Sequence, residues 1–380
     1  MSYLVQEIAA EVIRSTSRDH PADAALREVL KQTRNLAPFD ATEVAKTVFG
    51  YYRWHGWLRD ERGGVEAKMR VALRLAERFQ SNPASIPMTE LRARAVPAWT
   101  AEQMETSDAW LRSLQHEPKL WLRAKRGQAA ALTEKLRLTG TLAPPPLPDA
   151  LTYEGETDLF KTPEFHAGEF EIQDIASQAV GWLCDPKPGE TWWDACAGEG
   201  GKLLHLSDLM QNKGLIWASD RAAWRLQKLK RRTARAKVFN YRAALWDGGA
   251  KLPTKTKFDG VLVDAPCTGV GTWQRNPQAR WTTTIEDVRE LAELQMRLLT
   301  HAALAVKPGG KLIYSVCTLP KSETSAVAES FTVSQPEFEP MLLPVEKISR
   351  ALTSAATLTI WPQDLGGNGM FVAGWRRRTA

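Results

Sequence analysis

Apolar runs alternate with helical patterns from about Phe170 onward, and this alternation constrains the fold more than any other feature of the sequence. Helical spacing places helices at Leu203–Met210 and at about Ile285–Val306. Strands that alternate with helices predict the α/β class, with a doubly wound, Rossmann-like parallel sheet. The runs with the composition of buried parallel strands are Thr191–Asp194, Leu215–Asp220, Lys237–Leu245, Phe258–Asp264 and Lys311–Ser315.

Two cysteines stand where two of these predicted strands end. Cys267 follows Asp264-Ala-Pro, and Cys317 follows Tyr314-Ser-Val. Because ligands of open α/β sheets bind beyond the carboxyl ends of the strands, the two thiols are expected to face one pocket. The alternative is that both are ordinary small buried residues, as free cysteines usually are. Their position at the rim of the sheet favours a chemical role.

The cysteine count excludes other site types. The four cysteines, which include Cys184 and Cys196, fall in no metal-ligand spacing, so no metal site is expected. They are too few for a disulfide framework and are expected to be reduced. The apolar runs are too short to cross a bilayer, and the first residues lack a signal-peptide pattern, so we expect a cytoplasmic protein.

A glycine-rich turn, Ala195–Lys202, follows the first predicted strand. Glycines let the backbone approach a ligand closely. Asp220, at the end of the next strand, is placed to accept both ribose hydroxyls of a nucleoside. The turn is neither the Gly-x-Gly-x-x-Gly of dinucleotide enzymes nor a Walker loop, since leucine follows Lys202. The pattern predicts an adenosine-type cofactor, and S-adenosylmethionine fits best.

A methyl donor beside two thiols indicates methylation of cytosine. Carbon 5 of cytosine is a poor nucleophile, but a thiolate that adds to carbon 6 turns the ring into an enamine that accepts a methyl group. A second group must then remove the carbon 5 proton and let the enzyme thiol leave.

Three motifs carry a resemblance to a known family: Asp194–Lys202, Asp264–Gly271 with Arg275-Asn-Pro, and Tyr314–Thr318. They resemble those of the RsmB/Sun (Fmu) family of S-adenosylmethionine-dependent RNA cytosine-5 methyltransferases. The resemblance implies that Cys317 is the nucleophile and that Cys267 assists release of the methylated base. We expect Asp264 to support the attack by holding the cytosine ring. The positions that match cofactor contacts are Cys196, Ala197, Gly198, Glu199, Gly200, Gly201, Lys202, Asp220, Arg225, Asp247 and Asp264.

The chain departs from the family pattern at a few positions. Glu199 replaces the usual proline of the turn and puts an acid near a cofactor that has its own carboxylate. Gln274 and Gln278 stand where Arg and Asp are common, and Asn368 neutralises the acid of a terminal motif. These departures bear on cofactor affinity and substrate identity, and none alters the two thiols.

Three consecutive domains are expected. Residues 1–115 show helical spacing and are similar to the NusB-like RNA-binding domain of the family. Residues 116–169 form a small α+β module, with a strand at Lys119–Lys125 and a proline-rich connection at Thr141–Asp149. Residues 170–380 form the methyltransferase domain.

Charge favours a nucleic-acid partner. The formal net charge is +6, and every charged residue between Asp220 and Asp247 is basic, including Lys230, Arg231 and Arg232. Such a cluster attracts phosphates in a salt-dependent way, although a solvated helix face is the alternative. Single-stranded or looped RNA is the expected target, because the cytosine must leave its stack to reach a buried thiol. Trp273 is either a base-stacking partner or a core residue.

Two other functions stay open. In a DNA cytosine-5 methyltransferase the pair Pro266-Cys267 would supply the nucleophile, but the second thiol at Cys317 and the lack of a late recognition insert argue against it. A ribosome-assembly factor would keep the fold and bind ribosomal RNA without catalysis. For the enzyme we expect a monomer acting on RNA, with ribosomal RNA favoured.

Overall fold

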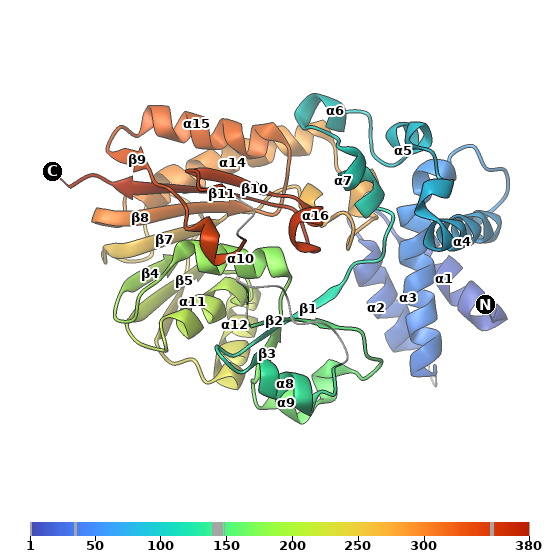
Figure 1. Ribbon diagram of the computed structural model, residues 1–380, viewed down its shortest axis with the longest axis horizontal. Coiled ribbons are helices and arrows are strands. Elements are labelled where there is room, and N and C mark those ends of the chain that lie inside the picture. Colours follow the sequence, from blue (N-terminus) through green and yellow to red (C-terminus); the bar gives the residue numbers. More distant parts are fainter. Residues whose placement is uncertain (1, 34–35, 139–146, 148, 350–352, 380) are drawn as a thin grey trace. The chain divides into compact units, whose positions relative to one another are not determined.

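The computed structural model describes residues 2–33, 36–138, 147, 149–349 and 353–379, and the chain divides into two compact units (Figure 1). The helical unit comprises Met1–Pro118 and Gly269–Ile285. The sheet unit comprises Lys119–Thr268 and Glu286–Ala380. The helical unit therefore takes a segment from the middle of the chain.

The longer helices of the helical unit are amphipathic. In α1 (Tyr3–Ser15), Val5, Ile8 and Val12 recur every three to four residues and are buried, as an apolar stripe on a helix requires. The Ser2 hydroxyl caps this helix by accepting the Val5 N–H at 3.3 Å. The other helices are α2 (Ala22–Gln32), α3 (Pro38–Arg53), α4 (Val65–Ser81), α5 (Met88–Arg94), α6 (Thr100–Gln103), α7 (Asp108–Ser113) and α13 (Ala279–Thr282).

The segment Gly269–Ile285 is built into the core of the helical unit. Trp273 is fully buried, with its ring centroid 5.9 Å from that of Trp99 and 6.3 Å from that of Trp110. The guanidinium of Arg280, also fully buried, donates hydrogen bonds to the backbone carbonyls of Arg53, Ala95, Leu114 and Trp273. Trp273 is therefore a core residue, and the base-stacking alternative is wrong.

The sheet unit begins with a small antiparallel sheet in the order β2-β1-β3. Its strands are β1 (Leu120–Ala124), β2 (Ala150–Tyr153) and β3 (Phe170–Ile172), accompanied by α8 (Ala129–Lys135) and α9 (Pro163–His166). The strand predicted at Lys119–Lys125 is present. Residues 141–146 and 148 of the predicted proline-rich connection lie outside the described residues.

The grouping of the chain differs from three consecutive domains at 1–115, 116–169 and 170–380. Residues 269–285 belong to the helical unit, and the small sheet takes its strands from both sides of residue 169. These contacts join residues far apart in the chain, so local composition does not encode them.

The second sheet runs in the order β10-β11-β8-β7-β4-β5-β6, with β9 paired to β11. Neighbours from β8 to β6 pair in parallel, and β11 pairs antiparallel with β8. The doubly wound, Rossmann-like prediction is confirmed. The strands are β4 (Thr191–Asp194), β5 (Leu215–Asp220), β6 (Tyr241–Leu245), β7 (Phe258–Asp264), β8 (Val306–Val316), β9 (Phe338–Pro340), β10 (Thr357–Ile360) and β11 (Met370–Arg377).

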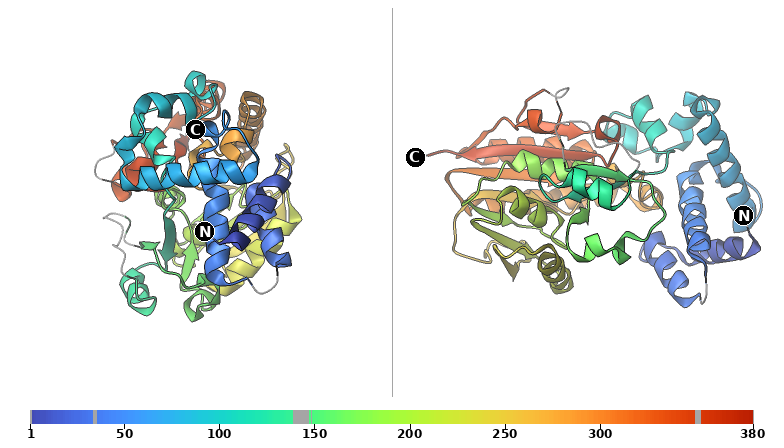
Figure 2. Two further views of the ribbon diagram at one scale, coloured as in Figure 1. Left: turned by 90° about the vertical axis from the view of Figure 1, so that its right-hand side faces the viewer. Right: turned by 60° about the horizontal axis from the view of Figure 1, so that its bottom comes forward.

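Helices cover both faces of this sheet (Figure 1 and Figure 2). Leu262 of β7 packs with Leu203 on one face, and its neighbour Val263 packs with Leu299 on the other. Since both faces are covered, the strand is a continuous apolar run. The helices are α10 (Ile175–Cys184), α11 (Gly201–Leu209), α12 (Ala223–Ala236), α14 (Ile285–Ala303), α15 (Ser325–Ser334) and α16 (Pro362–Leu365).

Two predicted strand boundaries are wrong by a few residues. The third strand begins at Tyr241 and not at Lys237, because Lys237 has φ 57° and ends α12 in a left-handed conformation. The fifth begins at Val306, directly after the turn that follows α14.

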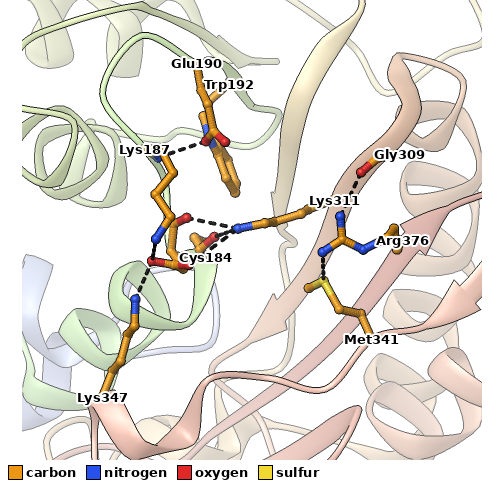
Figure 3. A network of polar contacts seen from close by, with 10 residues as sticks. Cys184, Lys187, Glu190, Trp192, Gly309, Lys311, Met341, Lys347 and Arg376 are labelled. Carbon is orange, nitrogen blue, oxygen red and sulfur yellow. Dashed lines mark hydrogen bonds and ion pairs between the residues drawn. The ribbon is translucent and has the colours of Figure 1, made fainter.

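The amino-terminal ends of the parallel strands are tied by ion pairs. Lys311 Nζ donates to the backbone carbonyls of Cys184 at 3.4 Å and Asp185 at 2.9 Å (Figure 3). Lys187 and Lys347 both pair with the Asp185 carboxylate. This network fixes the end of α10 to the sheet, at the edge opposite the one that carries the predicted site.

Candidate active site

The predicted site residues converge at the carboxyl ends of β4, β5, β7 and β8. A cavity of about 380 Å³ opens there, within the volume range of small-molecule sites. Its lining residues are Ala195, Cys196, Ala197, Gly198, Glu199, Asp220, Arg221, Arg225, Trp246, Asp247, Gly248, Asp264, Ala265, Pro266, Leu294 and Leu298.

The glycine-rich turn divides into a part that lines the cavity and a part that supports it. Gly198 has φ 54° and lines the cavity, with no other atom within 4 Å of where a Cβ would stand. Gly200 has φ 87°, and Leu229 packs 2.9 Å from its absent Cβ. Gly200 therefore lets the chain turn into α11, which begins at Gly201. Neither glycine belongs to the cavity lining.

Asp220 is the best-placed ligand for a nucleoside ribose. It is 6% exposed, and its carboxylate accepts the N–H of Gly198 at 3.0 Å and of Ala222 at 2.8 Å. An ionised carboxylate accepts about four hydrogen bonds, so acceptor capacity is left for two ribose hydroxyls. Trp246, Leu294 and Leu298 offer apolar surface for a flat base. The residues present thus fit an adenosine-type cofactor.

Glu199 lines the cavity and forms an ion pair with a lysine of α12. Its carboxylate accepts Lys228 Nζ of α12 at 2.7 Å, so a cation offsets the acid that replaces the family's proline. We therefore expect little repulsion between Glu199 and a cofactor carboxylate.

Asp264 and Lys202 connect the cofactor cavity to the thiols. Asp264 lines the cavity and accepts Lys202 Nζ at 2.7 Å and Ser315 Oγ at 2.8 Å. Burial opposes the charge of Lys202, but Asp264 and the nearby Cys317 raise its pKa above the ordinary lysine value. The ammonium of Lys202, a predicted cofactor contact, lies against Asp264 and near Cys317, the predicted nucleophile.

The two predicted catalytic thiols are neighbours. Cys267 Sγ lies 3.4 Å from Cys317 Sγ, and both side chains are half-buried. The other cysteines differ from this pair. Burial raises the pKa of the Cys184 thiol and, together with Asp194 and Asp264, that of Cys196, so neither is a ready nucleophile.

Asp194 lies beneath the site as a buried acid. It is 1% exposed, and burial together with Asp264 raises its pKa to about 7, partly offset by Lys202. The carboxyl ends of the strands therefore concentrate acidic groups.

The basic cluster of α12 is only partly free for phosphates. Arg232 Nη2 lies 2.8 Å from the Glu171 carboxylate, and Arg235 also pairs with Glu171. Arg232 thus has a structural partner, whereas Lys230 and Arg231 are exposed. In the tail, Arg376 and Arg377 belong to β11 and donate to the backbone carbonyls of Gly309 and Val306.

Sequence reasoning missed several lining residues. Trp246 immediately precedes the predicted Asp247, and its indole also packs 4.9 Å from that of Trp193. Leu294 and Leu298 are spaced four residues apart on α14, which predicts a buried face without indicating a ligand. Among the described residues, no group of His, Cys, Asp or Glu could hold a metal ion, and no helix is long and apolar enough to cross a membrane.

Residues 181–376 match the family model of the 16S rRNA methyltransferase RsmB/F. This chain belongs to that family. Within it, the probable ribosomal RNA small subunit methyltransferase B of Synechocystis sp. is 35% identical over 264 residues, which cover 67% of this chain and 58% of that protein. The tRNA (cytosine(72)-C(5))-methyltransferase NSUN6 of Mus musculus is 32% identical over 218 residues, 53% of this chain and 41% of that protein.

The matches leave part of each relative uncovered. The chain spans 58% of the Synechocystis protein and 49% of the Bacillus subtilis protein of the same name. Among solved structures, PH0851 superposes with a TM-score of 0.80 at 23% identity, covering 99% of this chain and 100% of that one. That likeness shows a shared fold over both units.

Proposed function

We propose that this protein transfers a methyl group from S-adenosylmethionine to carbon 5 of a cytosine in RNA. The observation that carries the proposal is the pair of thiols 3.4 Å apart, beside an acid-lined cavity at the ends of parallel strands. Cytosine C5 chemistry needs one thiol to add and a second group to help remove a proton, and two adjacent thiols meet that need.

Each residue has a proposed role in this reaction. The Cys317 thiolate adds to carbon 6, and the electron pair of the 5,6 double bond moves toward carbon 5. Asp264, with the nearby Lys202, holds the ring at its polar edge while this charge develops. The cofactor supplies an electrophilic methyl group to carbon 5.

Release completes the cycle. The proton on carbon 5 is removed with assistance from Cys267, its electron pair restores the 5,6 double bond, and the Cys317 thiolate leaves. The cofactor contacts proposed here are Cys196, Ala197, Gly198, Glu199, Asp220, Arg225, Asp247 and Asp264, with Gly200, Gly201 and Lys202 shaping the turn.

Ribosomal RNA is the proposed substrate, because the family model and the Synechocystis relative both carry that name. The NSUN6 relative makes transfer RNA the second candidate. The exposed Lys230 and Arg231 on α12 would meet phosphates. We propose that the protein acts in the cytoplasm as a monomer.

A trapping experiment tests the proposal. The parent protein should transfer labelled methyl groups to deproteinised ribosomal RNA or to small ribosomal subunits, and Cys317→Ala should abolish both transfer and covalent adduct. Cys267→Ala should let attack proceed but stall release, leaving protein cross-linked to RNA on a denaturing gel.

The opposite outcomes discriminate the alternatives. An adduct in Cys317→Ala but not in Cys267→Ala would mean that the DNA-type arrangement, with Cys267 as nucleophile, is correct. No transfer by the parent and no adduct in any variant would favour the non-catalytic assembly factor. Comparing bisulfite maps of RNA from a deletion strain and its parent would identify the cytosine.

A further inference from the structure

One buried carboxylate connects the two loops that carry the thiols. Glu323, in the short turn η5 (Lys321–Glu323), is fully buried. Its Oε1 accepts hydrogen bonds from the Thr268 backbone N–H and from Gln295 Nε2, each at 2.9 Å. Its Oε2 accepts the Thr268 hydroxyl and, at 3.1 Å, the Thr318 hydroxyl.

These partners adjoin the thiols in the sequence. Thr268 directly follows Cys267, and Thr318 directly follows Cys317. Gln295 of α14 also donates to the carbonyl of Pro266, which directly precedes Cys267, at 3.0 Å. Glu323 and its partner Gln295 therefore fix the chain on both sides of Cys267 and immediately after Cys317.

Glu323 is itself held in place. The Tyr314 hydroxyl lies 2.7 Å from the Glu323 backbone carbonyl, to which it can donate. Burial raises the pKa of Glu323, and the hydrogen bonds from Thr268, Gln295 and Thr318 oppose that rise. Two N–H groups contact Oε1, and two hydroxyls contact Oε2 and also lie 2.8 Å from each other, so both carboxylate oxygens are hydrogen-bonded.

A geometric role explains this carboxylate better than thiol activation does. A negative charge near a thiol disfavours the thiolate, so Glu323 would not help Cys317 to ionise. A buried charge also costs free energy of desolvation and is weak evidence for stability alone. Its hydrogen bonds, in contrast, join two loops whose separation decides whether both thiols reach one base.

We propose that Glu323 is a positioning residue that sets the distance between the Cys267 and Cys317 thiols. The importance of this role for catalysis rests on the proposed function, because only a reaction that uses both thiols in turn requires a fixed distance between them. The thiol separation itself can be measured without methyl transfer.

Disulfide formation with diamide reports the separation. The oxidant takes up two hydrogens as the 3.4 Å contact between the sulfurs closes to a bond, and peptide mass spectrometry follows the Cys267–Cys317 product. Glu323→Ala should slow this step by about 10-fold or more, since a misplacement of about 1 Å can cost about 100-fold in a positioned reaction. The rate of disulfide formation in Glu323→Gln should stay within about threefold of the parent rate. The glutamine carbonyl oxygen can still accept the Thr268 and Gln295 N–H groups, and its amide can donate to the two threonine hydroxyls once these have rotated.

Matched variants separate positioning from general damage. Thr318→Val removes the hydroxyl next to Cys317, with its contacts to Glu323 and Thr268, and should give an intermediate rate of disulfide formation. Thr318→Ser keeps the hydroxyl and should match the parent. In RNA methylation, Glu323→Ala should lower kcat by about 10- to 100-fold with little change in KM for S-adenosylmethionine.

Three outcomes would overturn the proposal. One is an unchanged disulfide rate in a Glu323→Ala protein that still unfolds cooperatively and binds S-adenosylmethionine. If Glu323→Ala does not fold, a parent-like rate of disulfide formation in Thr318→Val would overturn the proposal in its place. A Glu323→Gln protein as impaired as Glu323→Ala would show that the charge matters and the geometry does not. If the variants alter the disulfide rate while the parent methylates no RNA, the positioning role stands and the proposed function fails.

Discussion

Acidic side chains are paired differently at the two ends of the parallel strands in the large sheet. At the amino-terminal end, lysines enclose the carboxylates: Lys307 lies 2.8 Å from Asp259, and Lys187, Lys311 and Lys347 surround Asp185. At the carboxyl end, Asp220 and Asp264 line one cavity and Asp194 is buried nearby. There Lys202 contacts Asp264, and Arg225 stays 3.8 Å from Asp220. Acids surrounded by cations thus stabilise the scaffold, whereas acids with spare acceptor capacity are available to a ligand.

The largest expected effect comes from removing an acid at the carboxyl end of the strands, with the removal of an acid at the amino-terminal end as the control. In the Cys267→Ala background, Asp264→Ala should lower the rate of covalent adduct formation by about 100- to 1,000-fold, the cost of losing one preorganised electrostatic group. Asp259→Ala should leave that rate within about twofold and lower only the melting temperature. Gel quantification of the adduct measures both. Equal losses in the two variants would contradict this difference between the two ends of the sheet.

Cofactor affinity is the next most sensitive quantity. Asp220→Ala should weaken S-adenosylmethionine binding by roughly 1.5–3 kcal/mol, the range for hydrogen bonds to charged groups. Calorimetry measures this, with Asp259→Ala as the control at the other end of the sheet. Unchanged affinity in Asp220→Ala would remove Asp220 from the cofactor site.

The two ends should also respond to pH with opposite signs. The pKa of Asp194 is raised to about 7, so between about pH 4 and pH 7 the folded protein holds a proton that unfolding releases, and the free energy of unfolding falls as pH rises. Asp194→Asn should therefore gain stability relative to the parent across this window, by at most about 1.4 kcal/mol per pH unit.

Asp259 provides the contrast for this experiment. Burial opposes its charge, but hydrogen bonds from Lys307 and Thr191 lower its pKa below the ordinary value. Its contribution to stability is present above the unfolded pKa and is lost as pH falls through the lower folded value. Asp259→Asn should thus lose stability relative to the parent as pH rises through about 4. Urea unfolding at several pH values decides the signs, and a parallel response of both variants would contradict the prediction.

The smallest expected effect is on the salt dependence of RNA binding and concerns basic residues of α12. If Lys230 and Arg231 bind phosphates, changing both to Ala should flatten the log–log salt dependence of RNA binding by about 0.7 to 0.9 for each phosphate that is no longer neutralised. Arg232→Ala should instead lower the melting temperature, because the buried Glu171 loses a partner. Binding isotherms at several salt concentrations measure the slope. A slope that changes only with Arg232 would reverse these roles.

Local sequence predicts many of the strands and the paired cysteines, but it does not predict contacts between residues that lie far apart in the chain. The strands ending at Asp194, Asp220 and Asp264 are predictable because runs covered on both faces are apolar along their whole length. The strand-end cysteines are predictable as a pair because parallel strands share one carboxyl edge. Glu323 gave no signal, since its partner Thr268 lies 55 residues away and Lys-Ser-Glu-Thr has no distinctive pattern.

The same limit applies to cations with distant partners. Arg232 was predicted as a phosphate contact, but its partner Glu171 precedes it by 61 residues. Lys202 was predicted beside the cofactor and contacts Asp264, 62 residues later. Residue type and spacing indicate that a charge is present, whereas only the folded chain decides which group neutralises it.

The segment 269–285 has a consequence for the order in which the protein acquires structure during synthesis. The first 118 residues leave the ribosome early, but the core of the helical unit lacks Trp273 and Arg280 until residue 285 has been made. At about 5–20 residues per second this delay is roughly 10 to 30 s. Part of the apolar surface of the amino-terminal helices therefore stays uncovered until most of the parallel strands of the sheet unit have been translated.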